Sequence, residues 1–223
     1  MQLCAADAHN DLSVKPATLT AVTLSDTGTA ERRAAIRSKP PNVLVYCGKK
    51  DSSRLFVSMK SVLCEVLNTD QFVIYHLKHD QVLTTPWHDN ASLLVIASEK
   101  VYDGIDQQFL QYFVHGGRLI SFGSAFDSLL VEKDVREPSL SGQLLSVMTL
   151  QCDAGHDRVH VIGTKYCYTT SPPLLSDVTV TSLACDHVTC RPVIIEAVHQ
   201  LSAGVAILSQ ACLLVFVSIC ISN

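Results

Sequence analysis

The sequence predicts an α/β fold in which a mostly parallel sheet carries flanking helices and is followed by additional β-strands. Three observations support this class. Short apolar runs without polar alternation are typical of strands that are buried on both faces. These runs alternate with segments whose apolar residues recur at helical period. Each link between successive runs is longer than the dozen or so residues that a parallel crossover requires, so the alternation favours a parallel sheet.

The regular pattern begins after a pair of prolines. The run Asn42–Cys47 (NVLVYC) is apolar and rich in β-branched residues, so we expect a buried strand that ends at Gly48. The oxygens of Asp51–Ser53 are expected to cap the helix that follows. The apolar positions of that helix form one stripe: Leu55, Phe56, Met59, Val62, Leu63 and Val66.

The strand–helix unit then repeats. Phe72–Tyr75, Leu93–Ala97 and Arg118–Phe122 are expected to form the second, third and fourth strands. Before the fourth strand, Asp103 is expected to cap a helix and Gly116–Gly117 to end it, because glycine takes the left-handed conformation without cost. The buried stripe predicted for this helix is Ile105, Phe109, Leu110 and Phe113.

The pattern changes after residue 130, where short β-rich runs are separated by turns that contain Pro and Asp. These runs are Leu144–Leu150, Val159–Gly163, Val178–Leu183, Val193–Val198 and Val205–Leu208. We interpret them as strands added to the core, and antiparallel pairing stays open. The expected organisation is a flexible tail at 1–41, an α/β domain with a β-rich carboxyl-terminal part at 42–210, and an apolar tail at 211–223.

Composition argues against several classes of protein. Hydrophobic residues make up 48% of the chain, enough for a core, and a formal charge of −4 gives no reason to expect nucleic-acid binding. The nine cysteines lack the spacing of a disulfide framework, which indicates a reducing compartment; without a secretory signal, the expected location is the cytoplasm. Ser and Gln residues interrupt the charge-free end, so a strand and tail are favoured over a membrane helix.

The strongest catalytic candidate is Ser124, in the turn Phe122–Phe126 (FGSAF) after the fourth strand. A strand-to-helix turn in an open α/β sheet is where a nucleophile elbow exposes its side chain. The second glycine of an elbow is missing, so a structural turn is favoured. A catalytic serine would need a histidine within hydrogen-bond reach, and His76, His79 and His115 are the candidates.

Two groups resemble metal sites only superficially. Cys185, His187 and Cys190 are close in sequence, but structural zinc normally takes four ligands and no second pair balances these three. His156 and His160 would share a face only on a helix, whereas the surrounding residues have the character of a strand. We interpret these two as surface histidines.

Two further groups follow predicted strands. His76, His79 and Asp80 are interpreted as solvated loop residues. Gly48–Lys50 precedes a helix N-terminus, where anions bind, but it lacks the glycines of a phosphate-binding loop. We therefore assign no catalytic, cofactor-binding or metal-binding residue.

Several segments in a fixed order carry a family resemblance. They are Lys39–Tyr46 (KPPNVLVY), Arg54–Phe56 (RLF), Val73–Leu77 (VIYHL), Pro86–Ser98 (PWHDNASLLVIAS) and Phe109–Gly117 (FLQYFVHGG). Together they resemble the amino-terminal part of animal biotin–protein ligases (holocarboxylase synthetases) over residues 38–126, and more weakly to about residue 210.

The resemblance implies a flavodoxin-like, class I glutamine-amidotransferase-like domain. Such amidotransferases carry a cysteine at the elbow, where this chain has Ser124 or Ala125, which argues against amidotransfer. In the family, biotin and ATP bind a later catalytic domain with a Gly-Arg-Gly-Arg signature, of which only Gly117-Arg118 is echoed here.

The expected function is accordingly a non-catalytic, regulatory or substrate-selecting region of a biotin–protein ligase, in a truncated chain that binds no cofactor. The expected partners are the ligase catalytic domain and biotin-acceptor carboxylase domains. The alternative is a small amidotransferase-like or peptidase-like enzyme that uses Ser124. A third possibility, a membrane-tethered binding protein, depends on residues 203–222.

Overall fold

The structure is a computed structural model that describes residues 40–102, 104–136, 145–152, 158–170 and 173–211. Its first half contains β1 (Asn42–Tyr46), α2 (Ser52–Val66), β2 (Val73–His76), α3 (His79–Thr84), η1 (His88–Asn90), β3 (Ala91–Ile96), α4 (Ile105–Val114), β4 (Arg118–Phe122) and η2 (Ala125–Leu129). Its second half contains β5 (Glu132–Val135), β6 (Leu145–Cys152), β7 (Arg158–Thr164), β8 (Tyr166–Thr169), β9 (Val178–Asp186), β10 (Pro192–His199) and β11 (Val205–Ser209).

The four strands predicted in the first half pair in parallel within one sheet. Strand β1 lies between β2 and β3, and β3 pairs with β4. This arrangement confirms the parallel pairing of the four apolar runs. The expected tails are not described, apart from Pro40, Pro41 and Ala211.

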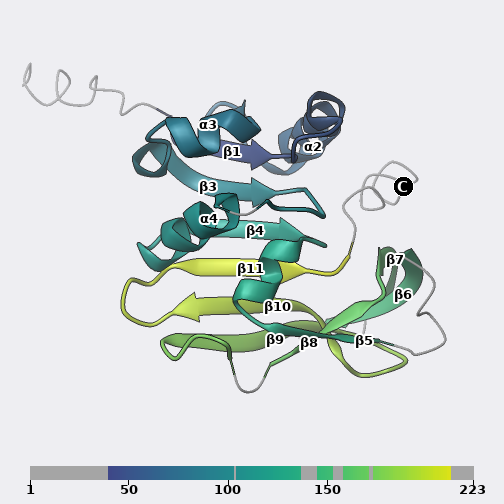
Figure 1. Cartoon of the computed structure of the whole chain (residues 1–223). Helices are drawn as coiled ribbons and strands as arrows, with labels where there is room; N and C mark the ends of the chain where they lie inside the picture. The colour runs from purple at the N-terminus through teal and green to yellow at the C-terminus, as the bar shows by residue number, and fades with distance from the viewer. Residues whose placement is uncertain (1–39, 103, 137–144, 153–157, 171–172, 212–223) are drawn as a thin grey trace, which may run out of the picture. The chain divides into compact units, whose positions relative to one another are not determined.

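The fold class expected from the sequence, a mostly parallel sheet with flanking helices, is wrong. The nine-stranded sheet has the order β2-β1-β3-β4-β11-β10-β9-β6-β7 and is mixed (Figure 1). Four neighbouring pairs are antiparallel: β11 with β10, β10 with β9, β9 with β6, and β6 with β7. Short links cause the difference, because Gln200–Gly204 and His187–Arg191 are long enough for a hairpin but too short for a parallel crossover. The described residues after Leu129 contain no helix.

The last described strand, β11, joins the two halves of the sheet. It pairs in parallel with β4, through registers such as Ile207 with Ile120, and antiparallel with β10, where Ile207 faces Glu196. Figure 1 shows β11 between these two neighbours, although β4 and β11 are far apart in the sequence. A separate two-stranded sheet is formed by β5 and β8.

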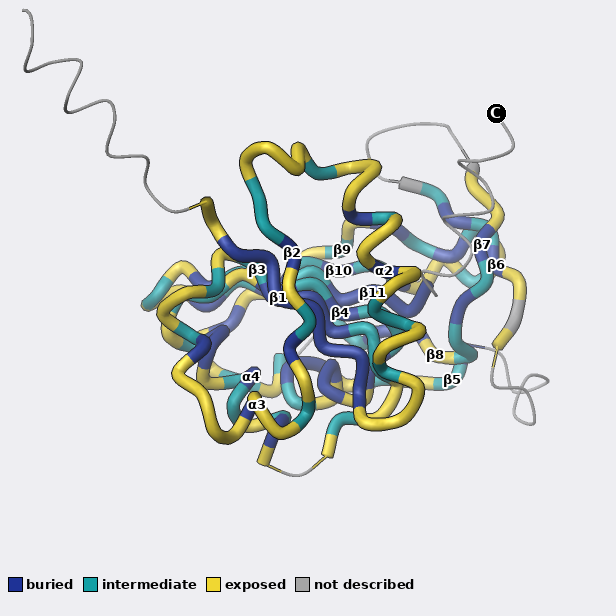
Figure 2. Tube along the Cα trace, turned by 90° about the horizontal axis from the view of Figure 1, so that it is seen from above, coloured by how far each residue is buried: buried dark blue, intermediate teal, exposed yellow. Residues whose placement is uncertain are grey.

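The helices cover the two faces of the parallel strands unequally. Helix α2 packs Met59 and Leu63 against Val43 and Val45 on one face, while α3 and α4 pack on the other (Figure 2). Along β11 and β10, partly exposed residues alternate with buried ones. Such alternation is typical of a strand that buries only one of its faces. The second half of the sheet therefore has one well-covered face and one that is only partly covered.

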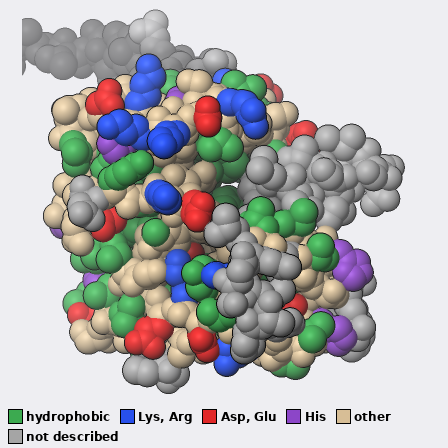
Figure 3. Space-filling model, turned by 45° about the vertical axis from the view of Figure 1, so that its right-hand side comes forward, with side chains coloured by type: hydrophobic (Ala, Val, Ile, Leu, Met, Phe, Trp, Pro, Cys, Tyr) green, Lys and Arg blue, Asp and Glu red, His purple; other side chains and the backbone are tan. Residues whose placement is uncertain are grey.

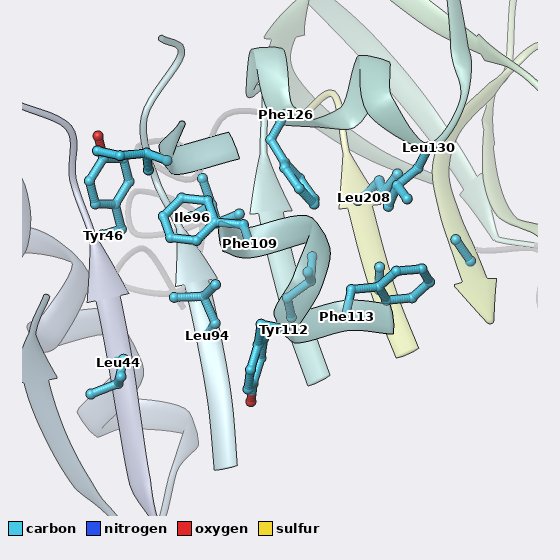
Figure 4. Packing of buried hydrophobic residues seen from close by; sticks show 14 of the residues in the cluster. Leu44, Tyr46, Leu94, Ile96, Phe109, Tyr112, Phe113, Phe126, Leu130 and Leu208 are labelled. Atoms are coloured by element: carbon cyan, nitrogen blue, oxygen red, sulfur yellow. The ribbon is translucent and has the colours of Figure 1, made fainter. Parts of the chain in front are cut away.

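The main core lies on the α4 face. Figure 4 shows Phe109 and Phe113 of α4 among side chains from β1, β3 and β11. Both phenylalanines are fully buried, as the helical stripe predicted. Leu110 is only partly buried, and Tyr112 takes a buried position that the stripe did not include. Burial also raises the pKa of Cys47, after β1, to about 12, so this thiol remains neutral and contributes as an apolar side chain.

The observed helix ends agree only in part with those predicted from the sequence. Asp51 occupies the N-cap position of α2, but its side chain makes no capping hydrogen bond. Gly116 follows α4 with φ of 95°, the left-handed conformation expected there. Asp103, the predicted cap of α4, lies outside the described residues. Within the described ranges, no helix is long and apolar enough to cross a membrane.

Candidate functional site

The turn after β4 places Ser124 inside the protein. Gly123 has φ of 59°, and its N–H donates to the carbonyl of Ser209 over 2.6 Å. The chain then enters η2, where the hydroxyl of Ser124 accepts a hydrogen bond from the N–H of Phe126 (3.2 Å). Ser124 has no exposed surface. Its hydroxyl therefore caps a short helix, and a capped, buried hydroxyl is poorly placed for nucleophilic attack.

We predict that Ser124→Ala lowers the free energy of unfolding by about 1 kcal/mol, within the 0.5–2 kcal/mol range of lost N-caps. The buried N–H of Phe126 would lose its described side-chain acceptor. Urea denaturation of the two proteins measures the difference. The same samples should show no labelling of Ser124 by a fluorophosphonate probe. Stoichiometric labelling that disappears in Ser124→Ala would contradict the structural role.

A buried carboxylate lies one turn further along η2. Asp127 has no exposed surface, and its Oδ1 accepts a hydrogen bond from Ser121 Oγ of β4 (2.5 Å). Its Oδ2 accepts from Tyr168 Oη of β8 (2.6 Å) and from Gln210 Nε2 after β11 (3.2 Å). We call these four residues the Asp127 cluster. It connects three segments that are distant in sequence.

Burial determines the electrostatics of this cluster. It raises the pKa of Asp127, while Lys133 and the hydrogen bonds from Ser121 and Tyr168 act in the opposite direction. It also raises the pKa of Tyr168 well above the usual value, and the adjacent carboxylate adds to this effect. Tyr168 therefore stays protonated and remains a hydrogen-bond donor. The cluster holds the carboxylate in place, and none of its members reaches a histidine through a described hydrogen bond.

Lys133 of β5 brings a positive charge close to Asp127. Its Nζ donates a hydrogen bond to the carbonyl of Ser124 (2.9 Å) and lies 6.0 Å from the ring centre of Tyr166. Burial lowers the pKa of Lys133, and the charge of Asp127 opposes this shift. The ammonium has three N–H groups, of which one is used by that carbonyl.

A cavity of about 830 Å³ opens beside α2 and these residues. We call it the α2 cavity. Phe122 and Gly123 at the end of β4 line it, as does Gln210 after β11. It thus lies outside the carboxyl ends of parallel strands, where ligands of open α/β sheets bind. Figure 3 turns this side of the molecule forward and shows apolar side chains next to both basic and acidic ones.

The histidines proposed as partners of Ser124 make other contacts. His76 stacks on Phe56, with ring centres 4.7 Å apart, and burial and Lys78 lower its pKa. His79 is the first residue of α3, which corrects the expected loop, and its Nδ1 lies 3.2 Å from Tyr46 Oη. His115 contacts the carbonyl of Gln111 in its own helix. Asp80, in the first turn of α3, is exposed as expected.

The superficial metal motifs do not converge on one point. Cys185 Sγ lies 3.3 Å from Ser182 Oγ, and His187 Nδ1 lies 3.2 Å from Gln151 Oε1. Cys190 is exposed at the turn between β9 and β10. The described residues contain no group of three or more His, Cys, Asp or Glu side chains that could hold a metal ion.

Other sequence candidates have separate locations. His160 lies on strand β7, as the strand pattern predicted, while His156 lies outside the described residues. Gly48 has φ of 75° and leads into exposed Lys49 and Lys50 before α2. Sequence analysis did not find Asp127, because its partners come from other parts of the chain. The one local signal was an Asp directly after the turn Phe122–Phe126.

Comparison with known proteins connects part of this chain to a ligase. No protein-family model matches the chain. Human biotin–protein ligase is 37% identical to it over 98 residues, which are 43% of this chain. The matched part spans 14% of the length of the human protein. A region of this chain is therefore related to a biotin–protein ligase.

Solved structures show the fold alone. The exo-β-1,4-mannosidase Op5Man5 from Opitutaceae bacterium strain TAV5 has a TM-score of 0.55 at 14% identity, over 87% of this chain and 35% of the mannosidase. A ThuA-like protein from Bacteroides uniformis has a TM-score of 0.49 at 11% identity, over 79% of this chain and 83% of that protein. The mannosidase match shows that most of this chain has a fold found within a larger protein.

Proposed function

We propose that this chain corresponds to a non-catalytic, amino-terminal region of a biotin–protein ligase and that it regulates or selects the carrier-protein substrate. The observation that carries this proposal is the 37% identity to the human ligase over 98 residues. The proposed partners are a ligase catalytic domain and biotin-acceptor domains of carboxylases, and the proposed location is the cytoplasm. Biotin and ATP would bind the partner domain, and none would bind here.

Two features of the chain support a non-catalytic role. The hydroxyl of Ser124 is buried and accepts a backbone hydrogen bond, which argues against the alternative enzyme. The sequence Gly117-Arg118, the partial echo of the ligase signature, lies at the start of β4, the opposite end from the α2 cavity. A Cβ at Gly117 would lie 2.5 Å from the carbonyl oxygen of Tyr112, so close packing of α4 explains this glycine.

A binding experiment tests the proposed role. The purified chain would be immobilised and presented separately with the catalytic domain of human biotin–protein ligase and with a biotin-acceptor domain. We expect saturable binding to at least one of them, and a change in the KM of the ligase for the acceptor when the chain is added in trans. Absence of binding and of any effect on biotin transfer would contradict the proposal.

We also predict that the chain forms no biotinyl-adenylate from biotin and ATP. Release of radioactive pyrophosphate, with the human ligase as positive control, measures this activity. Adenylate formation above background by the parent chain would contradict the non-catalytic role.

A further inference from the structure

We propose that the α2 cavity binds a small amphipathic monocarboxylate, with the apolar body against α2 and the carboxylate at Lys133. This inference goes beyond the proposed function and does not depend on it. The site is built by separate parts of the chain: α2, the segment after β3, the end of β4 with η2, β5, the start of β6, the segment that joins β7 to β8, and Gln210 after β11.

The wall formed by α2 is apolar. Leu55, Met59 and Val62 line the cavity from successive turns of the helix. Phe122 of β4 lies at its base and is only partly buried. A pocket of a few hundred cubic ångströms with mainly apolar walls and a few polar groups is typical of a small-molecule site. A volume of about 830 Å³ fits this class.

This pocket exists because the sheet is covered unevenly. Helix α2 packs on β1, β2 and β3, and among the other described helices only the short η2 contributes to the cavity, through Ala125 and Ser128. The β6–β7 hairpin, which begins at Leu145, forms the opposite wall with Tyr166 of β8. Among the described residues, Phe122 at the end of β4 thus lines the cavity between α2 and the hairpin.

The charges that line the cavity select an anion. Lys100, Lys133 and Lys165 contribute three ammonium groups, and Glu99 contributes one carboxylate. Most of the charged side chains that line the cavity are basic, which favours an anion, while Glu99 opposes a ligand with several negative charges. Lysine acts as a point charge, and a carboxylate needs no more than one or two such donors.

Lys133 is the best placed of the three lysines to fix the ligand. It is half-buried and its Nζ is held by the carbonyl of Ser124, so the ammonium has a defined position. The charge of Asp127 also acts on this ammonium, but the described side-chain hydrogen bond of Lys133 goes to a neutral carbonyl and uses one of three N–H groups, so others are left for a carboxylate. Charge-assisted bonds of this kind are stronger than neutral ones. A ligand that contacts the apolar wall of α2 and also binds the ammonium of Lys133 must have an apolar body and one carboxylate, as an amphipathic monocarboxylate has.

The probe is 1-anilinonaphthalene-8-sulfonate, a fluorescent amphipathic anion, titrated against the full chain with octanoate as competitor. We expect saturable binding of one probe per chain and displacement by octanoate. Octanamide has the same apolar body without the charge and should compete at least about fivefold less well, as expected for loss of one charge-assisted contact. Equal competition by both compounds would overturn the role of the carboxylate.

Matched variants locate the site. Lys133→Gln should weaken probe binding at least about fivefold, while Lys60→Gln, on an exposed position of α2 outside the cavity lining, should leave it unchanged. Ser58→Trp fills the cavity from an exposed helical position and should abolish binding without removing a lysine. Circular dichroism verifies that each variant is folded. Probe binding that neither Lys133→Gln nor Ser58→Trp weakens would overturn the proposal. These probe titrations are independent of the binding experiment with the ligase catalytic domain and the biotin-acceptor domain.

Discussion

Replacing Asp127 by alanine is expected to lower the free energy of unfolding by about 3 kcal/mol or more, since each buried donor left unsatisfied costs about 1–3 kcal/mol. The variant would leave the hydroxyls of Ser121 and Tyr168 and the amide of Gln210 without their common acceptor. The loss is large against the 5–15 kcal/mol that is typical of whole domains. Equilibrium urea denaturation at neutral pH measures it.

An exposed aspartate provides the control for this prediction. Asp134 pairs with Arg191 over 2.9 Å, but its side chain is 58% exposed. Because an exposed ion pair contributes little, Asp134→Ala should cost less than about 1 kcal/mol. Similar losses in Asp127→Ala and Asp134→Ala would contradict the importance of the Asp127 cluster.

The raised pKa of Asp127 gives this prediction a pH signature. The folded protein holds the proton of Asp127 more tightly than the unfolded chain does, because burial disfavours the charge. The contribution of this group to stability is therefore greatest in acid and falls as pH rises from the usual value of 3.8 through the raised one. Asp127→Asn should remove that part of the pH dependence, which denaturation at several pH values would measure.

The second large effect is expected at Gly204, in the turn between β10 and β11. A Cβ at this position would overlap the carbonyl oxygen of Phe113 in α4, and Phe113 is fully buried. The obstacle is backbone rather than a flexible side chain, so relief requires α4 and the turn to separate. We expect Gly204→Ala to cost about 3 kcal/mol, the upper end for overpacked sites, in thermal or urea denaturation.

The neighbouring residue should respond in the opposite direction. Ala203 is exposed and has φ of 57°, a left-handed conformation that favours glycine. Ala203→Gly should therefore leave stability unchanged or raise it by up to about 1 kcal/mol. If Gly204→Ala is no more destabilised than Ala203→Gly, the close contact between α4 and this turn does not exist in solution.

The sequence predicted the parallel strands well because their signal is local. Runs such as Asn42–Cys47 are apolar on both faces, and β1 is buried at every position. Helix α3 (HDQVLT) was missed, since six residues with one buried side chain, Val82, carry almost no helical period. Strands β5 (EKDV) and β8 (YCYT) were missed because they have no alternating apolar pattern. They are defined by their pairing with each other.

The mixed sheet and the buried cluster could not be predicted, because both depend on contacts distant in sequence. The hydrogen bonds from Tyr168 and Gln210 to Asp127 span 41 and 83 residues. The sequence predicted a turn with Ser124 after the fourth strand, and the structure has this turn. The hydroxyl of Ser124, however, is buried. Which side of a turn faces solvent is decided by packing, and packing was not visible in the turn itself.

The position of β11 determines when this fold can form during synthesis. Strands β1 to β4 can pair as soon as they emerge from the ribosome, and so can the hairpins of the second half. The edge of β4 nevertheless stays unpaired until Val205–Ser209, the last described strand, has been made. An unpaired edge exposes backbone hydrogen-bonding groups and invites pairing with other chains. A nascent chain that stalls before Val205 would thus be prone to aggregate, while completion of β11 closes that edge and unites both halves in one step.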